Sequence, residues 1–291
     1  MPSVKNLIVL LTALILHSLT ASGVGMALTP LDPGGNLSNF KVNTVVKSSD
    51  GYVWAGTLSG LSRHDSYSST PYYINGSDMA PVGDNDVDGI WEDSTGRLWL
   101  KSHNMWHIYN PLTDLIEHNP DTILSAAGVK GYPTAIGTDR AGGMWVATDA
   151  GKIFHLAAGE NSTAREVDLG NFPSLKGKKI TGACDSREGM VFVTDRGELY
   201  CVSHGSAKVR WHDGSIARSI PEGDTMVFSI MLDREGLGWI YNTEQLWLYN
   251  SHTRSWANDR LPASGLGMVV KAIVEDDNGR VLIGRDHHGL E

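Results

Sequence analysis

Short apolar stretches alternate with polar turns along most of the chain, and one pattern of this kind occurs six times. Each copy has an apolar strand, an acidic turn, a Gly-x-x-Trp element and a second apolar strand. The copies read VVKSSDGYVWAGT, IWEDSTGRLWLKS, IGTDRAGGMWVAT, ACDSREGMVFVTD, IMLDREGLGWIYN and IVEDDNGRVLIGR. Their glycines, spaced 45, 46, 47, 47 and 43 residues apart, are Gly51, Gly96, Gly142, Gly189, Gly236 and Gly279. A period of this length built from strands and turns is typical of β-propeller blades.

Two further positions of the repeat have a clear physical role. The large residues three positions after each glycine are Trp54, Trp99, Trp145, Phe192, Trp239 and Leu282. The aspartates three positions before it are Asp93, Asp139, Asp233 and Asp276, and the acid moves to Asp50 in the first copy and to Asp185 in the fourth. We expect the aspartate to accept hydrogen bonds from turn amides and the glycine to take a positive φ. The aromatic residue is expected to fill the wedge between neighbouring blades.

A third and a fourth strand follow the second one in the repeat. The third strand is predicted in LSGLSRHD, DAGKIFHL, DRGELYCV and EQLWLYN, and the fourth in TPYYI, DLIEH, AREVDL and KVRWH. The predicted fold is therefore all-β. It is a β-propeller of four-stranded antiparallel blades over residues 28–291, with five complete blades and a partial sixth.

Residues 1–27 have the layout of a signal peptide. Lys5 supplies a positive charge, Leu7–Leu16 is an apolar stretch, and small residues around Gly23 and Ala27 offer cleavage positions. The apolar stretch is too short to span a bilayer as a stable helix, and no later stretch of about 18 apolar residues follows. We expect export to the periplasm; a buried N-terminal helix is the alternative interpretation.

Composition narrows the class of protein. Of the 291 residues, 41% are hydrophobic, which is enough for a packed core, and the 33 glycines agree with many turns. The net charge of −9 gives no indication of a basic surface for binding nucleic acid, so we expect no nucleic-acid partner in this region.

The pattern Asp-x-x-Gly-x-x-Trp-ϕ-x-Thr, followed by Gly-Leu-x-Arg-ϕ-Asp, resembles the two-component regulator propeller repeat. The nearest copies are VWAGTLSGLSRHDSYS in the first blade and GIWEDSTGRLWL in the second. The resemblance covers about residues 38–291. The sequence departs from the pattern where Phe192 and Leu282 replace tryptophan, and where the second and fifth blades lose Gly-Leu.

This resemblance implies the periplasmic sensor region of a hybrid two-component histidine kinase. In such receptors two propellers are typically followed by a β-sandwich, a membrane helix, a kinase and a response regulator, and many sense oligosaccharides. The resemblance also implies that residues 28–38 form an outer strand that closes the ring, with partner strands beyond residue 291. We therefore expect an N-terminal piece of a longer sensor with a seven-bladed first propeller. The full receptor is expected to be a homodimer anchored in the inner membrane.

Propellers bind ligands near the central axis, where the loops between second and third strands meet the inter-blade loops. Short polar side chains beside aromatic residues suit sugar hydroxyls, so we expect an oligosaccharide or another small polar ligand there. The candidate contacts are His103, Asn104, Trp106, Asp149, Asp195, Asn242, Glu244, Arg285 and His287, with Asp84, Asn85, Tyr132 and Lys176 as additions from the inter-blade loops. For Asp149 and Asp195, a role in the hairpin turns is the alternative.

Other chemistry finds little support in the sequence. None of the eleven histidines lies in His-Glu-x-x-His or another recognisable ligand spacing, and no Gly-x-Ser-x-Gly element accompanies a triad. We expect neither a metal nor another cofactor, and no catalytic residue. Two alternatives stay open. One is a secreted streptogramin-lyase-type propeller enzyme, whose repeat is similar and whose base would be His103 or His287. The other is a protein-interaction propeller.

The repeat also predicts the state of the two cysteines. Cys184 falls on the first strand of the fourth blade and Cys201 on its third strand, which places them roughly 9–10 Å apart. A disulfide needs Cα atoms within about 7 Å, so we predict two free, buried thiols. Titration of the denatured protein with a thiol reagent will give the same count with and without prior reduction. A higher count after reduction would contradict this prediction.

Overall fold

The computed structural model describes residues 37–75, 85–103, 105–118, 120–159, 162–221, 223–257, 270–276, 278–285 and 289–290. The predicted signal peptide lies outside the described residues. The described residues all belong to one compact unit, Asn36–Glu291.

Six antiparallel sheets follow one another along this unit, and each pairs its strands in sequence order. Blade 1 contains β1 (Val42–Lys47), β2 (Val53–Thr57), β3 (Gly60–His64) and β4 (Ser69–Tyr72). Blade 2 contains β5 (Gly89–Glu92), β6 (Leu98–Ser102), β7 (Met105–Asn110) and β8 (Leu115–Glu117). Blade 3 contains β9 (Pro133–Thr138), β10 (Met144–Thr148), β11 (Lys152–Leu156) and β12 (Arg165–Glu166).

The remaining blades have the same order. Blade 4 contains β13 (Ile180–Asp185), β14 (Met190–Thr194), β15 (Leu199–Val202) and β16 (Val209–Asp213). Blade 5 contains β17 (Ser229–Leu232), β18 (Leu237–Tyr241), β19 (Leu246–Asn250) and β20 (Ser255–Trp256), and blade 6 contains β21 (Val270–Glu275), β22 (Val281–Arg285) and β23 (Gly289–Leu290). The prediction of five four-stranded blades and a partial sixth is confirmed.

One helix of the structure is absent from the repeat pattern. Helix α2 (Pro120–Ala126) lies in the connection from blade 2 to blade 3, and its leading proline suits a first helical position. No α-helix occurs in the described parts of the other connections between blades, so the repeat pattern does not predict it. A short 3₁₀ turn, η1 (Ala217–Ser219), lies between blades 4 and 5.

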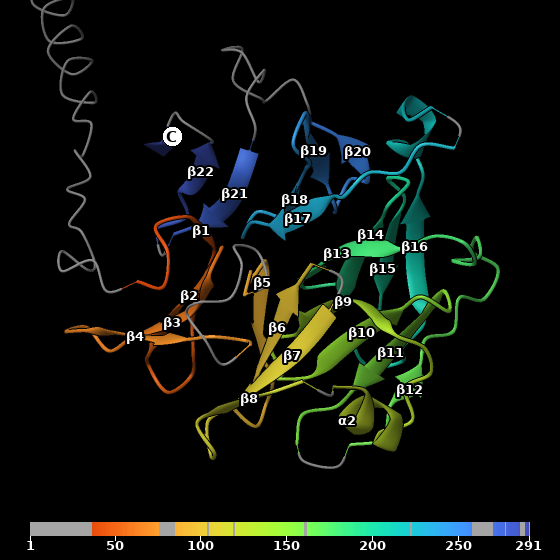
Figure 1. Ribbon diagram of the computed structural model, residues 1–291. Helices are drawn as coiled ribbons and strands as arrows, with labels where there is room; N and C mark the ends of the chain where they lie inside the picture. Colours follow the sequence, from red (N-terminus) through yellow and green to blue (C-terminus); the bar gives the residue numbers. More distant parts are fainter. Residues whose placement is uncertain are drawn as a thin grey trace, which may run out of the picture. The chain divides into compact units, whose positions relative to one another are not determined.

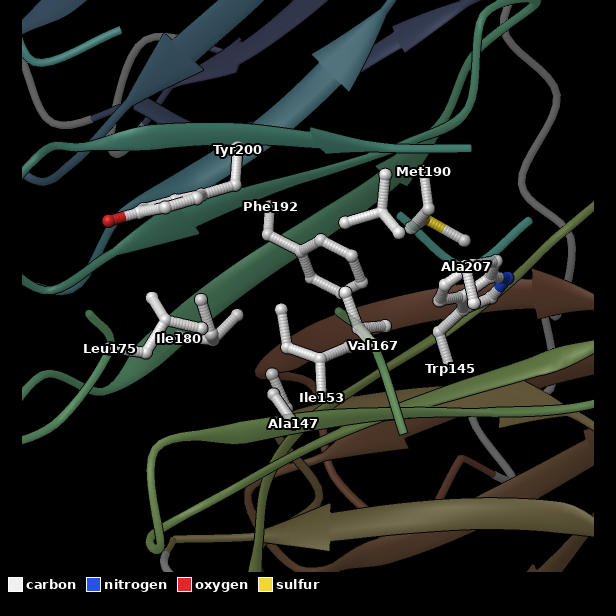
Figure 2. Packing of buried hydrophobic residues seen from close by; sticks show 12 residues of the cluster. Trp145, Ala147, Ile153, Val167, Leu175, Ile180, Met190, Phe192, Tyr200 and Ala207 are labelled. Carbon is white, nitrogen blue, oxygen red and sulfur yellow. The ribbon is translucent and has the colours of Figure 1, made fainter. Parts of the chain in front are cut away.

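The hydrophobic core lies between successive blades. First strands of neighbouring blades contact one another, as β1 does β5 and β9 does β13 (Figure 1). Figure 2 shows the interface of blades 3 and 4, where Trp145 on β10 and Phe192 on β14 belong to one buried cluster. Their ring centroids are 6.0 Å apart in an edge-on arrangement. The expectation that the repeat aromatics fill the wedges between blades is therefore confirmed for this pair.

The aspartate of the repeat joins the turn to the core. In blade 3, one carboxylate oxygen of Asp139 accepts the backbone N–H groups of Ala141 and Gly143, at 3.0 and 2.8 Å. Its other oxygen accepts the indole N–H of Trp145 at 2.8 Å. Gly142 completes the turn with a φ of +80°. Trp99 donates to Asp93, and Trp239 to Asp233, both at 2.9 Å.

In blades 1 and 4 the position three residues before the glycine holds no acid. The residues that occupy the aspartate position are serines: Ser48 accepts the indole N–H of Trp54 at 3.0 Å. Ser186 accepts the backbone N–H groups of Glu188 and Gly189, both at 3.2 Å. Asp50 instead accepts the Ser48 hydroxyl and the N–H of Tyr52. In blade 4, Phe192 has no N–H to donate, and the Ser186 hydroxyl serves the turn amides alone.

The two cysteines are unpaired, as predicted. Cys184 and Cys201 both lie opposite Val191, one from each side, so β14 separates them. Cys201 is fully buried and Cys184 partly exposed. Burial raises the pKa of Cys201 to about 12, which keeps its thiol protonated and unreactive.

The predicted ring-closing strand, residues 28–38, lies almost entirely outside the described residues. Ser38 is described, and its hydroxyl is 2.8 Å from that of Thr57 and 2.9 Å from that of Ser62. On the first blade the apolar side chains of Phe40, Val42 and Val45 are exposed.

The role of Asp139 can be tested by replacing it with asparagine. Burial alone would raise the pKa of Asp139, but the hydrogen bonds from Trp145 and the turn amides outweigh it and hold the pKa below its ordinary value. Asp139→Asn keeps a single acceptor oxygen, so urea denaturation should show a loss of about 1–3 kcal/mol at neutral pH.

The hydrogen bonds that Asp139 accepts also predict how the stability of the fold depends on pH. Because the pKa is lower in the folded state, the ionised carboxylate stabilises the fold above the unfolded value of about 4. This stabilisation is lost as the pH falls from there through the folded pKa. Wild type should therefore lose more stability on acidification than Asp139→Asn does. Asp224→Asn, at an exposed position, should behave as wild type; equal acid sensitivity of wild type and Asp139→Asn would refute the assignment.

Candidate functional site

Antiparallel pairing divides each blade into two ends. The loops between second and third strands and the connections between blades lie at one end, here called the loop end. The Asp–Gly turns between first and second strands, and the turns between third and fourth strands, lie at the other, here called the turn end. The candidate ligand contacts that lie within the described residues belong to the loop end.

The richest group of polar side chains at the loop end lies where blades 1 and 2 meet. Asp86 and Asp88 precede β5, and His103 follows β6 with a φ of +54°. Nδ1 of His103 lies 3.5 Å from an oxygen of Asp86 and 3.9 Å from one of Asp88. Asn43 on β1 donates its amide to the other oxygen of Asp86 at 2.6 Å. Two blades therefore hold two carboxylates and an imidazole together.

The charges of this group are not fully balanced. Burial, and next the charge of Asp88, raise the pKa of Asp86, although Asn43 and His103 oppose the shift. Lys101 lies close enough to Asp88 to interact with its charge, but burial lowers the pKa of its ammonium group. The imidazole of His103 is more than half exposed and faces solvent beside the two acids. This arrangement offers acceptors to hydroxyl groups and to cations.

Asp86, Asp88 and His103 are also the one group of described residues whose donor atoms could hold a metal ion, since those atoms all lie within 4.8 Å of one another. No recognisable metal-ligand spacing in the sequence marks this group. This group joins an inter-blade connection to a loop 15 residues further on, so local spacing could not reveal it. Asp86 and Asp88 are the site residues that sequence reasoning missed.

Asp149 and Asp195 serve the backbone of their own blades. A carboxylate oxygen of Asp149 accepts the N–H of Tyr132 at 2.8 Å, and one of Asp195 accepts that of Lys179 at 3.1 Å. In both cases the donor lies in the connection that enters the blade. The two carboxylates thus tie the second–third strand loop to the inter-blade connection, a role different from the hairpin-turn alternative.

Asn242 and Glu244 belong to one tight loop in blade 5. The side-chain oxygen of Asn242 accepts the backbone N–H groups of Glu244 and Gln245, at 2.8 and 2.7 Å. Asn242 is buried, whereas Glu244 is exposed. Of the two, Glu244 has the side chain available to a ligand.

Trp106 is a core residue. It is 2% exposed, and its indole N–H donates to the backbone carbonyl of Pro133 at 2.8 Å. Its ring packs against Trp91 with centroids 5.2 Å apart. A side chain with no free face cannot stack on a sugar, so the expected contact with Trp106 is corrected: the residue closes the interface of blades 2 and 3.

The remaining candidates divide into two sets. Arg285 is described and buried, at 8% exposure, and Asn85 accepts the backbone N–H of Asn75 at 2.8 Å. The candidates outside the described residues are Asp84, Asn104 and His287. The structure thus brings His103 together with acids from the preceding connection, whereas Asp149, Asp195 and Asn242 bond within their own blades and connections.

Solved structures with a similar fold include extracellular domains of two bacterial proteins and one bacterial surface component. The extracellular domain described as that of the hybrid two component system BT3049 from B. thetaiotaomicron has a TM-score of 0.60 and 18% identity, over 91% of this chain and 34% of that chain. The corresponding domain of BT4673 has a TM-score of 0.57 and 17% identity, and the match covers 86% of this chain and 32% of that chain. PorZ, a surface component of the type-IX secretion system of Porphyromonas gingivalis, has a TM-score of 0.52 and 15% identity. The match covers 85% of this chain and 37% of that chain.

At this level of identity the likeness concerns the fold, and the chain spans about a third of the length of these solved chains. No family model and no curated protein matches the sequence. Within the described residues, every helix is too short or too polar to cross a bilayer.

Replacing Asp195 and His103 should separate structural from ligand-facing side chains. Asp195 is buried and bonded to the backbone, so Asp195→Ala should lower the free energy of unfolding by about 1–2 kcal/mol. His103 is exposed, and His103→Ala should change it by less than about 0.5 kcal/mol. Urea denaturation measures both. A destabilised His103→Ala protein would mean that the imidazole is a structural element.

Proposed function

We propose that this chain is an extracytoplasmic ligand-sensing propeller of a two-component receptor. Its signal would pass to a histidine kinase outside this chain. The proposal is supported by the likeness to extracellular domains described as parts of hybrid two component systems, together with the export signal expected from residues 1–27.

The observation that carries a binding role is the group of Asp86, Asp88 and His103 at the loop end. Carboxylate oxygens accept hydrogen bonds from vicinal hydroxyls, and an imidazole accepts or donates them; Asn43 of blade 1 also bonds to Asp86 of this group. A ligand held there would contact residues whose relative position depends on how the blades pack. We therefore propose a small polar ligand, and an oligosaccharide in particular.

One observation favours a second candidate, a streptogramin-lyase-type enzyme. That chemistry needs a histidine base and a site for a divalent cation, and His103 lies beside two carboxylates. A sensor binds its ligand unchanged, whereas a lyase converts it, so measuring turnover in the presence of magnesium distinguishes the two.

A glycan array followed by titration calorimetry tests the sensing proposal. We expect a neutral oligosaccharide to bind without turnover, and His103→Ala and Asp88→Asn each to weaken its binding by about tenfold or more, because each removes a hydrogen-bonding group of the proposed site. His252→Ala, at the turn end, is the matched control and should bind as wild type. Magnesium-dependent cleavage of a lactone would replace sensing with the lyase proposal.

A further inference from the structure

Three of the blade interfaces share one contact at the turn end. The last residue of the first strand is an acid, and it accepts the backbone N–H of the turn in the preceding blade. Glu92 accepts Ser49 at 2.8 Å, Asp185 accepts Arg140 at 3.1 Å, and Glu275 accepts Arg234 at 2.9 Å. We call these residues the inter-blade carboxylates. They join blade 1 to 2, blade 3 to 4, and blade 5 to 6.

The two other described interfaces lack this carboxylate, and each has a cleft at its turn end. The corresponding residue is Thr138 between blades 2 and 3, and Leu232 between blades 4 and 5. At the first interface a cleft of about 500 Å³ opens between the turns of the two blades, lined among others by Ser94 and Gly142 but not by Thr138. A cleft of about 210 Å³ opens at the second, where Leu232 forms part of the wall.

The cleft between blades 4 and 5 is lined by three arginines from equivalent positions of the repeat. Arg140, Arg187 and Arg234 follow the aspartate or serine of their turns and are spaced 47 residues apart. Two of them lie near the acid of the next blade: Arg140 is 3.5 Å from Asp185, and Arg234 is 3.8 Å from Glu275.

Arg187 has no acidic residue of the next blade beside it, because Leu232 occupies the position that Asp185 and Glu275 occupy in their blades. Within the described part of the chain no hydrogen bond or ion pair engages its guanidinium group, which is exposed at the cleft. Arg187 therefore stands at a position where its two counterparts meet a carboxylate and where the protein supplies none.

The acids that line this cleft are already engaged. Asp233 accepts the indole N–H of Trp239, and Asp185 accepts the ring N–H of His204 at 2.6 Å. Glu188 accepts the indole N–H of Trp211 at 3.3 Å. Glu188 also lies 3.7 Å from His252, on the wall of the cleft. These partners leave Arg187 as the donor that faces an incoming anion.

The larger cleft between blades 2 and 3 differs in charge. Its turn residue is Ser94, and its arginine, Arg97, is held by Asp93 at 2.9 Å. A cation without a partner is therefore a feature of the smaller cleft.

We propose that the cleft between blades 4 and 5 binds the carboxylate of a small acidic ligand. The ligand carboxylate would take the place of the missing inter-blade carboxylate and accept hydrogen bonds from Arg187, with Arg140 and Arg234 at the rim. Planar guanidinium groups bind carboxylates with two parallel hydrogen bonds, which makes arginine suited to this role. The volume suits one acidic sugar or an organic acid.

This site is separate from the loop-end group of the proposed function. It lies at the opposite end of the blades and recognises a different charge, so either assignment can fail while the other holds.

Titration of the protein with galacturonate, followed by ¹H–¹⁵N spectra, tests the proposal. Galactose is the matched neutral probe, since it carries a hydroxymethyl group where galacturonate carries a carboxylate. Two variants address the site: Arg187→Ala removes the donor, and Leu232→Glu supplies the carboxylate that the other interfaces have. Arg196→Ala, an exposed arginine at the loop end, is the control.

We expect galacturonate to bind the wild type and galactose not to bind. Arg187→Ala and Leu232→Glu should each raise the dissociation constant of galacturonate by about tenfold or more, and Arg196→Ala should leave it unchanged. Thermal melting confirms folding, and Leu232→Glu should melt at or above the wild-type temperature.

Three results would overturn the proposal: no binding of galacturonate, equal binding of galactose, or binding that neither Arg187→Ala nor Leu232→Glu weakens. Loss of binding in Arg196→Ala alone would move the acidic ligand to the loop end. That outcome would refute this site and leave the proposed sensing function intact.

Discussion

A carboxylate that accepts both turn amides and an indole N–H is the interaction on which this structure depends. In blade 3, Asp139 closes the turn with one oxygen and orients Trp145 with the other. The tryptophan then fills the wedge against the next blade, so local turn geometry and inter-blade packing share one group. Buried polar groups must be satisfied, and here the bond that satisfies the indole also sets the register of the hairpin.

The exceptions do not follow one rule. Where the aromatic residue has no N–H, as with Phe192, a serine hydroxyl is enough for the turn. In blade 6, Leu282 stands in place of the aromatic residue, and Asp276 accepts the Nε–H of Arg280 with the oxygen that elsewhere takes the indole N–H. Blade 1 pairs a serine with Trp54, and blade 6 keeps Asp276 although Leu282 has no N–H, so the aromatic residue alone does not decide which acceptor stands before the turn.

The two ends of the blades offer different chemistry. At the loop end, acids from an inter-blade connection face His103 and present hydrogen-bond acceptors. At the turn end, arginines at equivalent positions of three repeats surround a cleft that one missing carboxylate leaves open. A chain with a net charge of −9 therefore has a local surface suited to anions, because neighbouring blades compensate the arginines unequally.

Repetition made the fold of this protein readable from its sequence: six spaced glycines with their partners predicted the blades, their strand order and the two unpaired cysteines. The sequence also identified His103 as a ligand contact to test. It could not show that Asp86 and Asp88 lie beside it, because that proximity depends on how an inter-blade connection folds against a loop of the same blade. The sequence predicted Trp106 as a ligand contact, but in the structure its side chain is buried in the core. Only the tertiary structure decided which polar residues serve the backbone and which face a ligand, because hydrogen-bond partners in a propeller come from adjacent strands and blades.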